Sequence, residues 1–242
     1  MQLFRSALYV LLIVLTIGCA SREKLDDADR TPSNSQTQTE AHFEFIEHGT
    51  FPAAGSLYNV HNRFVGSCVL VTPRAAITAG HCIELGNLKY ARFGNEEIMI
   101  DVQALHKNYN AGDDLGILFL ETESSHKPMS IIDTINLIPD MFPLYTIAHG
   151  EGRKKISKDK VYHYYGVLQN NPNEIVFLPL QTSVWFGDSG GALVCRDEKG
   201  NFVLIGIITH FSTMGDQIYE CAARRVDNFN LYDDIWQPWI AK

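Results

Sequence analysis

The stretch SVWFGDSGGALVC (residues 183–195) decides how the rest of this chain is interpreted. It sets one hydroxyl, that of Ser189, among Asp188 and three glycines, just ahead of an apolar, strand-like run. Glycine lets a backbone turn sharply and approach other groups closely, so these positions favour a cradle of N–H donors. A serine hydroxyl is a weak nucleophile at neutral pH. It needs a base, a group that orients the base, and donors for the oxyanion that forms on attack.

Two upstream stretches supply a base and an orienting acid. ITAGHC (residues 77–82) puts His81 at the end of a strand-like run, and GDDLGILFL (residues 112–120) puts Asp114 directly before an apolar strand. A carboxylate at that position can be buried against the imidazole and orient it. Asp113 competes for this role, but Asp114 occupies the position next to the strand.

A different hydrolase fold is the first alternative. GDSGG also satisfies G-x-S-x-G, the nucleophile turn of α/β-hydrolases, in which the acid and then the histidine follow the serine. Here the single histidine after Ser189 is His210, preceded by Asp197 and Glu198, and too few residues remain for the βα units of that fold. The strand-rich sequence before Ser189 also argues against the α/β-hydrolase fold.

The pattern of apolar residues predicts an all-β protein. From about residue 43, short runs rich in Val, Ile, Leu, Phe and Tyr alternate with Gly, Pro, Asn and Asp. Residues 121–141 have a weaker strand pattern, which favours a boundary there between two β lobes. Near the C-terminus, a helical period places five apolar residues on one face, with Pro238 as a possible kink. These residues are Tyr232, Ile235, Trp236, Trp239 and Ile240.

Three motifs together resemble the chymotrypsin-like (trypsin-fold) serine proteases, and the resemblance extends from about Ile46 to the C-terminal helix. Thr-Ala-(Ala/Gly)-His-Cys matches residues 78–82, Asp-(apolar)-(small)-Leu-Leu matches residues 114–118, and Gly-Asp-Ser-Gly-Gly matches residues 187–191. The order His, Asp, Ser is also that of the family. The resemblance implies an all-β fold of two packed six-stranded antiparallel barrels with a C-terminal helix.

The resemblance also implies a serine endopeptidase that acts on protein or peptide substrates without a metal or organic cofactor. His81 would be the general base and then the acid, Asp114 would hold its tautomer, and Ser189 would attack the scissile carbonyl. The N–H groups of Gly187 and Ser189 would form the oxyanion hole. A catalytically silent homologue that acts as a binding module is the alternative from another class.

The family's substrate pocket implies a specificity. Ser183, six residues before the nucleophile, would be an uncharged pocket floor. GIITHF (residues 206–211) resembles the family's substrate-binding strand, so Thr209 and His210 would lie on the binding edge, and Phe211 would narrow the pocket. Small or apolar substrate side chains are expected. His210 with Thr209 leaves acidic substrates open, as in the glutamyl endopeptidases, and Glu220 leaves basic ones open.

Two further features follow from the resemblance. FIEHGT (residues 45–50) resembles the activation site of the family, so cleavage before Ile46 would create an ammonium that pairs with Asp188. The family's half-cystines imply bridges Cys68–Cys82 and Cys195–Cys221, with free buried thiols as the alternative. The four residues are Cys68, Cys82, Cys195 and Cys221.

The N-terminus is typical of an exported protein. Arg5 precedes an apolar run at residues 7–17 that is too short to cross a bilayer and is expected to be a cleaved signal. LTIGC (residues 15–19) resembles a bacterial lipoprotein box, which implies lipid on Cys19, a membrane anchor and a location in the cell envelope. Plain secretion is the alternative.

The expected domain plan has three parts. Residues 1–19 form the signal, residues 20–45 form a tether or propeptide, and residues 46–242 form the protease domain. Residues 20–42 are poor in apolar side chains and so are expected to remain unfolded. The formal net charge of -8 at pH 7 opposes binding to nucleic acid. A monomer is expected.

Overall fold

The structure is a computed structural model, and the part of the chain that it describes comprises nine segments. These are residues 43–46, 50–133, 143–150, 155–157, 161–162, 173–177, 184–214, 217–227 and 236–238. All of them belong to one compact unit, Ser35–Lys242. The predicted signal, Cys19 and residues 20–42 of the predicted tether lie outside the described residues, as does Ser183. The tether was predicted to extend to residue 45, but its last residues form strand β1 (Phe43–Phe45), which pairs with β9 (Lys155–Ser157).

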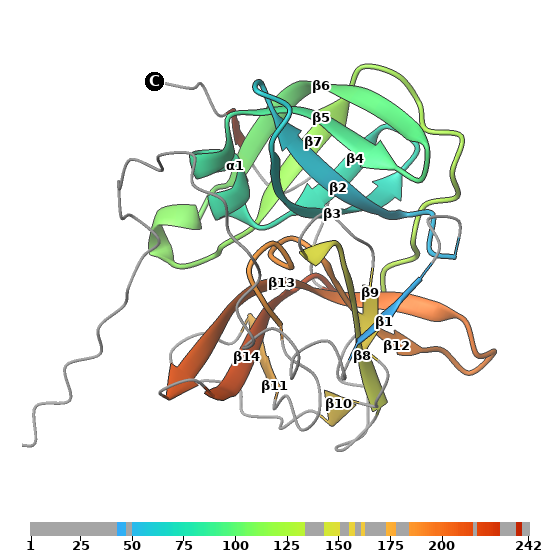
Figure 1. The fold of residues 1–242 in the computed structure, drawn as a ribbon, viewed down its shortest axis with the longest axis vertical. Coiled ribbons are helices and arrows are strands. Elements are labelled where there is room, and N and C mark those ends of the chain that lie inside the picture. The colour runs from blue at the N-terminus through green and yellow to red at the C-terminus, as the bar shows by residue number, and fades with distance from the viewer. Residues whose placement is uncertain are drawn as a thin grey trace, which may run out of the picture. The chain divides into compact units, whose positions relative to one another are not determined.

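A closed six-stranded barrel forms the first half of this unit (Figure 1). Its strands are β2 (Ala54–Asn59), β3 (Phe64–Thr72), β4 (Ala75–Thr78), β5 (Leu88–Phe93), β6 (Glu96–His106) and β7 (Gly116–Leu120). The long strand β6 closes the barrel because its first half pairs with β5 and its second half pairs with β7. Leu57, Ile77, Phe93 and Leu118 fill the interior and are fully buried.

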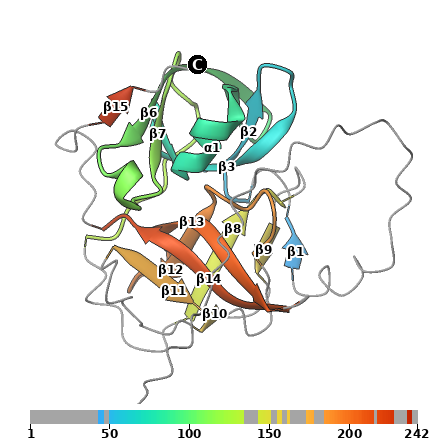
Figure 2. The ribbon, with the colours of Figure 1, turned by 90° about the vertical axis from the view of Figure 1, so that its left-hand side faces the viewer.

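An eight-stranded sheet forms the second half (Figure 2). Its strands are β1 (Phe43–Phe45), β8 (Pro143–Ala148), β9 (Lys155–Ser157), β10 (Val161–Tyr162), β11 (Glu174–Phe177), β12 (Ala192–Arg196), β13 (Phe202–Met214) and β14 (Gln217–Arg225). The path runs β1-β9-β8-β12-β13-β14-β11, with β10 beside β8, and every pair is antiparallel. The all-β prediction is confirmed, with closure into a barrel seen for the first half.

The two halves share one apolar core. Leu57 and Ile77 of the barrel belong to the same buried cluster as Ile147, Ala192 and Ile207 of the second sheet. The chain passes from one half to the other after β7, and its described part, residues 121–133, contains no strand. The lobe boundary predicted at residues 121–141 thus falls in the correct place for these residues.

Helices are short in the described segments. They are α1 (Gly80–Gly86) and the 3-10 turn η2 (Tyr109–Ala111). Neither these nor any other described helix has the length and apolar character that a membrane-crossing helix needs.

The C-terminal helix was predicted wrongly for Trp236, Gln237 and Pro238. These residues form strand β15 (Trp236–Pro238), which pairs antiparallel with His106, Leu105 and Ala104 of β6. Proline has no N–H for a helix interior but is accepted at the edge of a sheet, and β15 is an edge strand. The rest of the predicted helix lies outside the described residues.

Neither predicted disulfide is present, and the four cysteines among the described residues are buried thiols outside any disulfide. Cys195 pairs with Val203 and Cys221 pairs with Phe211, on opposite sides of β13 and eight positions apart along it. At about 3.3 Å per residue this offset is far beyond the reach of a disulfide.

Cys68 and Cys82 are likewise not bridged. The sulfur of Cys68 lies beside Gly55, and that of Cys82 lies beside Gly66, two positions along β3 from Cys68.

Candidate active site

The pairing of β4 with β7 brings His81 and Asp114 together. Thr78 at the end of β4 lies opposite Gly116 at the start of β7, so the residues that follow one strand meet those that precede the other. His81 Nδ1 lies 2.7 Å from Asp114 Oδ2. The backbone N–H of His81 donates to Asp114 Oδ1 at 2.8 Å. The carboxylate thus holds both the ring and the backbone of His81.

The electrostatics of His81 follow from this contact. Burial opposes the charged imidazole, but the hydrogen bond to Asp114 and the neighbouring Cys82 outweigh it and raise the pKa of His81 above its ordinary value. The side chain remains about one-third exposed, at 33%. A proton on Nδ1 that is donated to Asp114 leaves Nε2 as the basic nitrogen.

Asp113 takes no part in the contact with His81. Its carboxylate turns to Arg224 and His106, at 2.9 and 3.2 Å. The prediction that Asp114 rather than Asp113 would meet the imidazole therefore agrees with the geometry.

Ser189 lies in a turn that is packed between the two halves. The N–H of Ser67 in β3 donates to Ser189 O at 2.8 Å, and the N–H of Gly190 donates to Ile208 O in β13 at 2.8 Å. Gly190 has φ +84°, and a Cβ there would lie 2.0 Å from Ser67 O and 2.2 Å from Thr78 Oγ1. Only glycine fits this position.

The turn presents two unused donors. Gly187 has φ 89°. Its N–H and that of Ser189 meet no acceptor within the part of the chain that the structure describes. Such paired N–H groups beside a nucleophile are the arrangement that stabilises an oxyanion.

Ser67 fixes this turn and was missed by the sequence analysis. Its buried hydroxyl donates to Gly187 O at 3.0 Å and accepts the N–H of His149 at 2.9 Å. The peptide that joins Gly187 to Asp188 is therefore held from the first barrel. A serine in an apolar strand next to Gly66 gave no signal that separates this role from an ordinary core hydroxyl.

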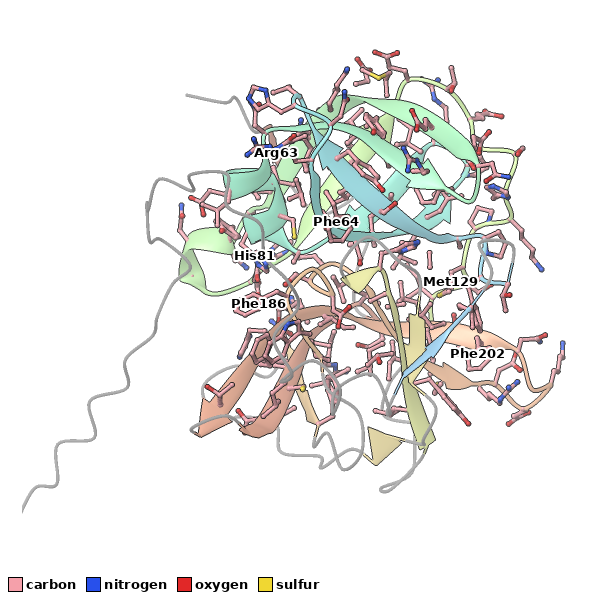
Figure 3. The ribbon with its side chains drawn as sticks, in the orientation of Figure 1. Arg63, Phe64, His81, Met129, Phe186 and Phe202 are labelled. Carbon is pink, nitrogen blue, oxygen red and sulfur yellow. The ribbon has the colours of Figure 1, made fainter. Side chains whose placement is uncertain are left out.

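Ser189 Oγ and His81 are not hydrogen-bonded to each other in this conformation. The hydroxyl instead donates weakly to Thr209 O at 3.4 Å. The two segments are nonetheless adjacent, because Cys82 Sγ lies 3.7 Å from Ser189 O. In Figure 3, His81 lies on the side of the first barrel that faces the second sheet.

Three aromatic side chains gather next to the turn. Trp185 and Phe211 stack with ring centroids 5.8 Å apart and planes at 12°, and Phe186 meets Phe211 edge-on at 5.4 Å. Phe186 is 62% exposed, which is unusual for so large an apolar group. The prediction that Phe211 would narrow a pocket stays a prediction, and Trp185 and Phe186 were not singled out from the sequence. Ser183 lies outside the described residues.

The other predicted binding residues lie on β13. Thr209 is buried, and its hydroxyl donates to Ala222 O at 3.3 Å. The imidazole of His210 is exposed, and its Nδ1 lies 3.5 Å from Glu174 Oε1. Burial raises the pKa of Glu174, and Glu220 adds to the effect while His210 opposes it. Glu174 was not singled out from the sequence.

The predicted activation pair is not formed in the intact chain. Asp188 is buried and accepts the N–H of Trp185 at 2.8 Å. Ile46 directly follows β1, and its nitrogen is part of a peptide bond rather than an ammonium. Cleavage before Ile46 remains a prediction.

Within the described residues, no group of three or more His, Cys, Asp or Glu side chains is arranged to hold a metal ion.

A comparison with protein-family models gives one match, described as Trypsin, over residues 43–232. The chain belongs to the trypsin family. The match covers more than half of the chain and includes His81, Asp114 and Ser189. Trypsin-like proteases act on protein and peptide substrates. A search of curated proteins returned no match.

Proposed function

We propose that the protein is an active serine endopeptidase of the trypsin family. The observation that carries the proposal is the bidentate contact of Asp114 with His81, beside a Ser189 turn with two N–H donors that meet no acceptor among the described residues. A catalytically silent homologue has no need of such an oriented base or of unused donors. Membership of the family shows the fold, but a shared fold by itself does not establish that a chain is catalytically active.

The proposed reaction begins with rotation of the Ser189 hydroxyl away from Thr209 O toward His81 Nε2. Hydrogen bonds of this kind are often long or absent before substrate binds. His81 accepts the hydroxyl proton as Ser189 Oγ bonds to the scissile carbonyl carbon, and the N–H groups of Gly187 and Ser189 stabilise the oxyanion. The protonated His81 then donates to the leaving amine, which leaves an acyl-enzyme.

Water completes the cycle. His81 accepts a proton from the water as the water oxygen attacks the acyl carbon. His81 then donates this proton to Ser189 Oγ when the ester bond breaks. Asp114 stabilises the imidazolium that forms in both halves of the cycle. No metal or organic cofactor enters any step.

We further propose a preference for small apolar residues at the substrate position before the cleaved bond. The resemblance puts Phe211 at the position where glycine keeps the family's primary pocket open, and Phe211 stacks on Trp185. An acidic side chain is the second option, since His210 is 53% exposed on its side chain, although Glu174 beside it offsets its charge.

An organophosphonate that labels serine nucleophiles tests the proposed activity. We expect the native chain to be labelled and Ser189→Ala to remain unlabelled, with His81→Ala labelled far more slowly because the base is gone. A folded native chain, tested both intact and after removal of its N-terminal segment, that takes up no label would support the binding-module alternative.

The N-terminal predictions remain proposals. We propose export with lipid on Cys19, and processing before Ile46 as the activating step. Mass spectrometry of the N-terminal peptide from the producing cell distinguishes a lipid-modified Cys19 from an unmodified terminus. N-terminal sequencing of labelled protein tests the processing, because active material that begins at Cys19 would contradict it.

A further inference from the structure

A buried ion pair and a histidine beside it join the two halves of the protease next to the proposed triad. Arg224 Nε lies 2.9 Å from Asp113 Oδ1, and His106 Nδ1 lies 3.2 Å from Asp113 Oδ2. The side chains of Arg224, Asp113 and His106 are 7%, 9% and 6% exposed. Arg224 belongs to β14 of the second sheet, whereas His106 ends β6 of the barrel and Asp113 lies in the connection between β6 and β7.

Arg224 is held rigidly on its side of the contact. Its Nη1 donates to Asn173 O at 3.0 Å and to Arg225 O at 2.8 Å, while Nε is used for Asp113. Three hydrogen bonds thus fix a guanidinium whose planar, forked geometry already restricts its direction.

Asp113 is the residue directly before Asp114, and short local hydrogen bonds brace the backbone around both residues. The N–H of Leu115 donates to Asp113 O at 2.7 Å, and the N–H of Asp114 donates to Gly112 O at 3.1 Å. A displacement of the Asp113 carboxylate therefore moves the peptide that carries Asp114.

The same strands also anchor the nucleophile. The N–H of Gly190 is bound to Ile208 O of β13. Ile208 pairs with Ala223 of β14, and Ala223 is the neighbour of Arg224. A continuous path of short contacts thus runs from the Ser189 turn through β13 and β14 to Arg224, then through Asp113 and Asp114 to His81.

We propose that the Asp113–Arg224 ion pair is a positioning device that holds Asp114 and His81 in register with Ser189 across the seam of the two halves. The proposal rests on the proposed function, because it concerns the geometry of that reaction. A buried ion pair is a poor stabiliser compared with apolar residues of similar volume, so stability alone is a weak reason for placing one here. Its value lies in the fixed direction of its hydrogen bonds.

The first test compares Arg224→Met with Arg225→Met. Both variants remove a guanidinium from neighbouring positions of β14, but the side chain of Arg225 pairs with Asp227 and not with Asp113. We expect Arg224→Met to lose about 10²-fold in kcat with little change in KM, the effect of a misplacement of about 1 Å. Arg225→Met retains the native kcat. Arg224→Lys restores only part of the loss, because an ammonium lacks the forked donor geometry.

The second readout is the titration of His81, and its measurement by NMR is independent of turnover and of the proposed activity. As the His81–Asp114 contact loosens in Arg224→Met, the pKa of His81 measured by NMR titration falls from its raised value toward its ordinary one. The acid limb of the kcat/KM profile moves to lower pH with it. A purely structural role would lower the unfolding temperature without moving either quantity in the folded protein.

The double variant Asp113→Leu/Arg224→Met covers the case in which a single variant fails to fold, since it removes both members of the ion pair together. We expect it to fold, with low kcat and a lowered His81 pKa. A folded double variant with native kcat and a native His81 titration overturns the positioning role. Failure of the proposed function looks different, because the native chain itself then takes up no phosphonate while its His81 titration still responds to Arg224→Met.

Discussion

The two halves of the site are built by different means. On the barrel side, the regular pairing of β4 with β7 places His81 and Asp114, and the contact is made by side chains. On the side of the second sheet, Ser189 lies in an irregular turn, and the key groups are backbone atoms of Gly187, Ser189 and Gly190. The barrel side should therefore depend on side-chain chemistry, whereas the turn should depend on backbone conformation and free space.

The largest effect is expected from Asp114→Asn, which tests the barrel side. An amide in place of the carboxylate favours the wrong tautomer of His81 and lowers kcat by about 10⁴-fold. The substitution also removes the main interaction that raises the pKa of His81, so this pKa falls. Because His81 must be neutral to act as the base, the activity of the native enzyme rises as the pH passes the raised pKa of His81. In the variant, this rise in activity occurs at lower pH.

Steady-state kinetics over a pH series measure both effects. Asp197→Asn is the control, because this exposed carboxylate bonds only near its own turn, to Lys199 and Asn201. A native rate in Asp114→Asn would show that the barrel side does not act through its carboxylate.

The next effect concerns the turn. Gly190→Ala forces a methyl group against Ser67 O and Thr78 Oγ1, so the turn must move and the rate of phosphonate labelling falls by about 10³-fold. Gly200→Ala is matched for backbone strain, since Gly200 has φ +82° but has no atom within 4 Å of the added Cβ. We expect the control to label normally. Equal losses in both variants would assign the effect to strain rather than to the packed space.

Ser67→Ala tests the link between the two halves. Loss of the hydroxyl frees Gly187 O and lets the peptide beside the oxyanion donors turn, which lowers kcat by about 10-fold to 10²-fold. Ser56 is buried opposite Ser67 on β2, and Ser56→Ala is the control with native kcat. Circular dichroism verifies that both variants are folded, and an unchanged kcat in Ser67→Ala would contradict the link.

The smallest effect concerns specificity. Phe211→Gly removes the ring that stacks on Trp185, and the opened space should raise kcat/KM for substrates with a large aromatic residue by about 10-fold relative to those with alanine. Cleavage of a peptide library measures the shift. Phe202→Leu, at the far end of β13, leaves the preference unchanged. A native profile in Phe211→Gly would place the pocket elsewhere.

The neighbouring residues Asp113 and Asp114 illustrate what the sequence could predict. Their positions relative to the following strand were enough to assign Asp114 rather than Asp113 to His81, because strand pairing fixes the positions of residues within a few places of the strand. Nothing in the sequence near Asp113 indicates its partner Arg224, which lies 111 residues further along the chain. Ser67 escaped notice for the same reason, since its partner Gly187 is 120 positions distant.

Errors also arose where a local pattern had two solutions. The apolar period near Trp236 fits a helix, but the open edge of β6 offered hydrogen bonds to a strand that contains Pro238. The cysteines suggested bridges by family position, whereas the register of β13 keeps Cys195 and Cys221 far apart. A one-dimensional pattern does not contain the register of distant strands.

The amino-acid order alone specified the strand-rich class, the His81, Asp114 and Ser189 motifs and the glycines around the serine, because each depends on neighbours along the chain. Folding in three dimensions settled how the Ser189 turn is pinned by Ser67 and how Arg224 ties the two halves together. These contacts join residues that are distant in sequence, and their partners become neighbours only when both sheets pack on their shared apolar core.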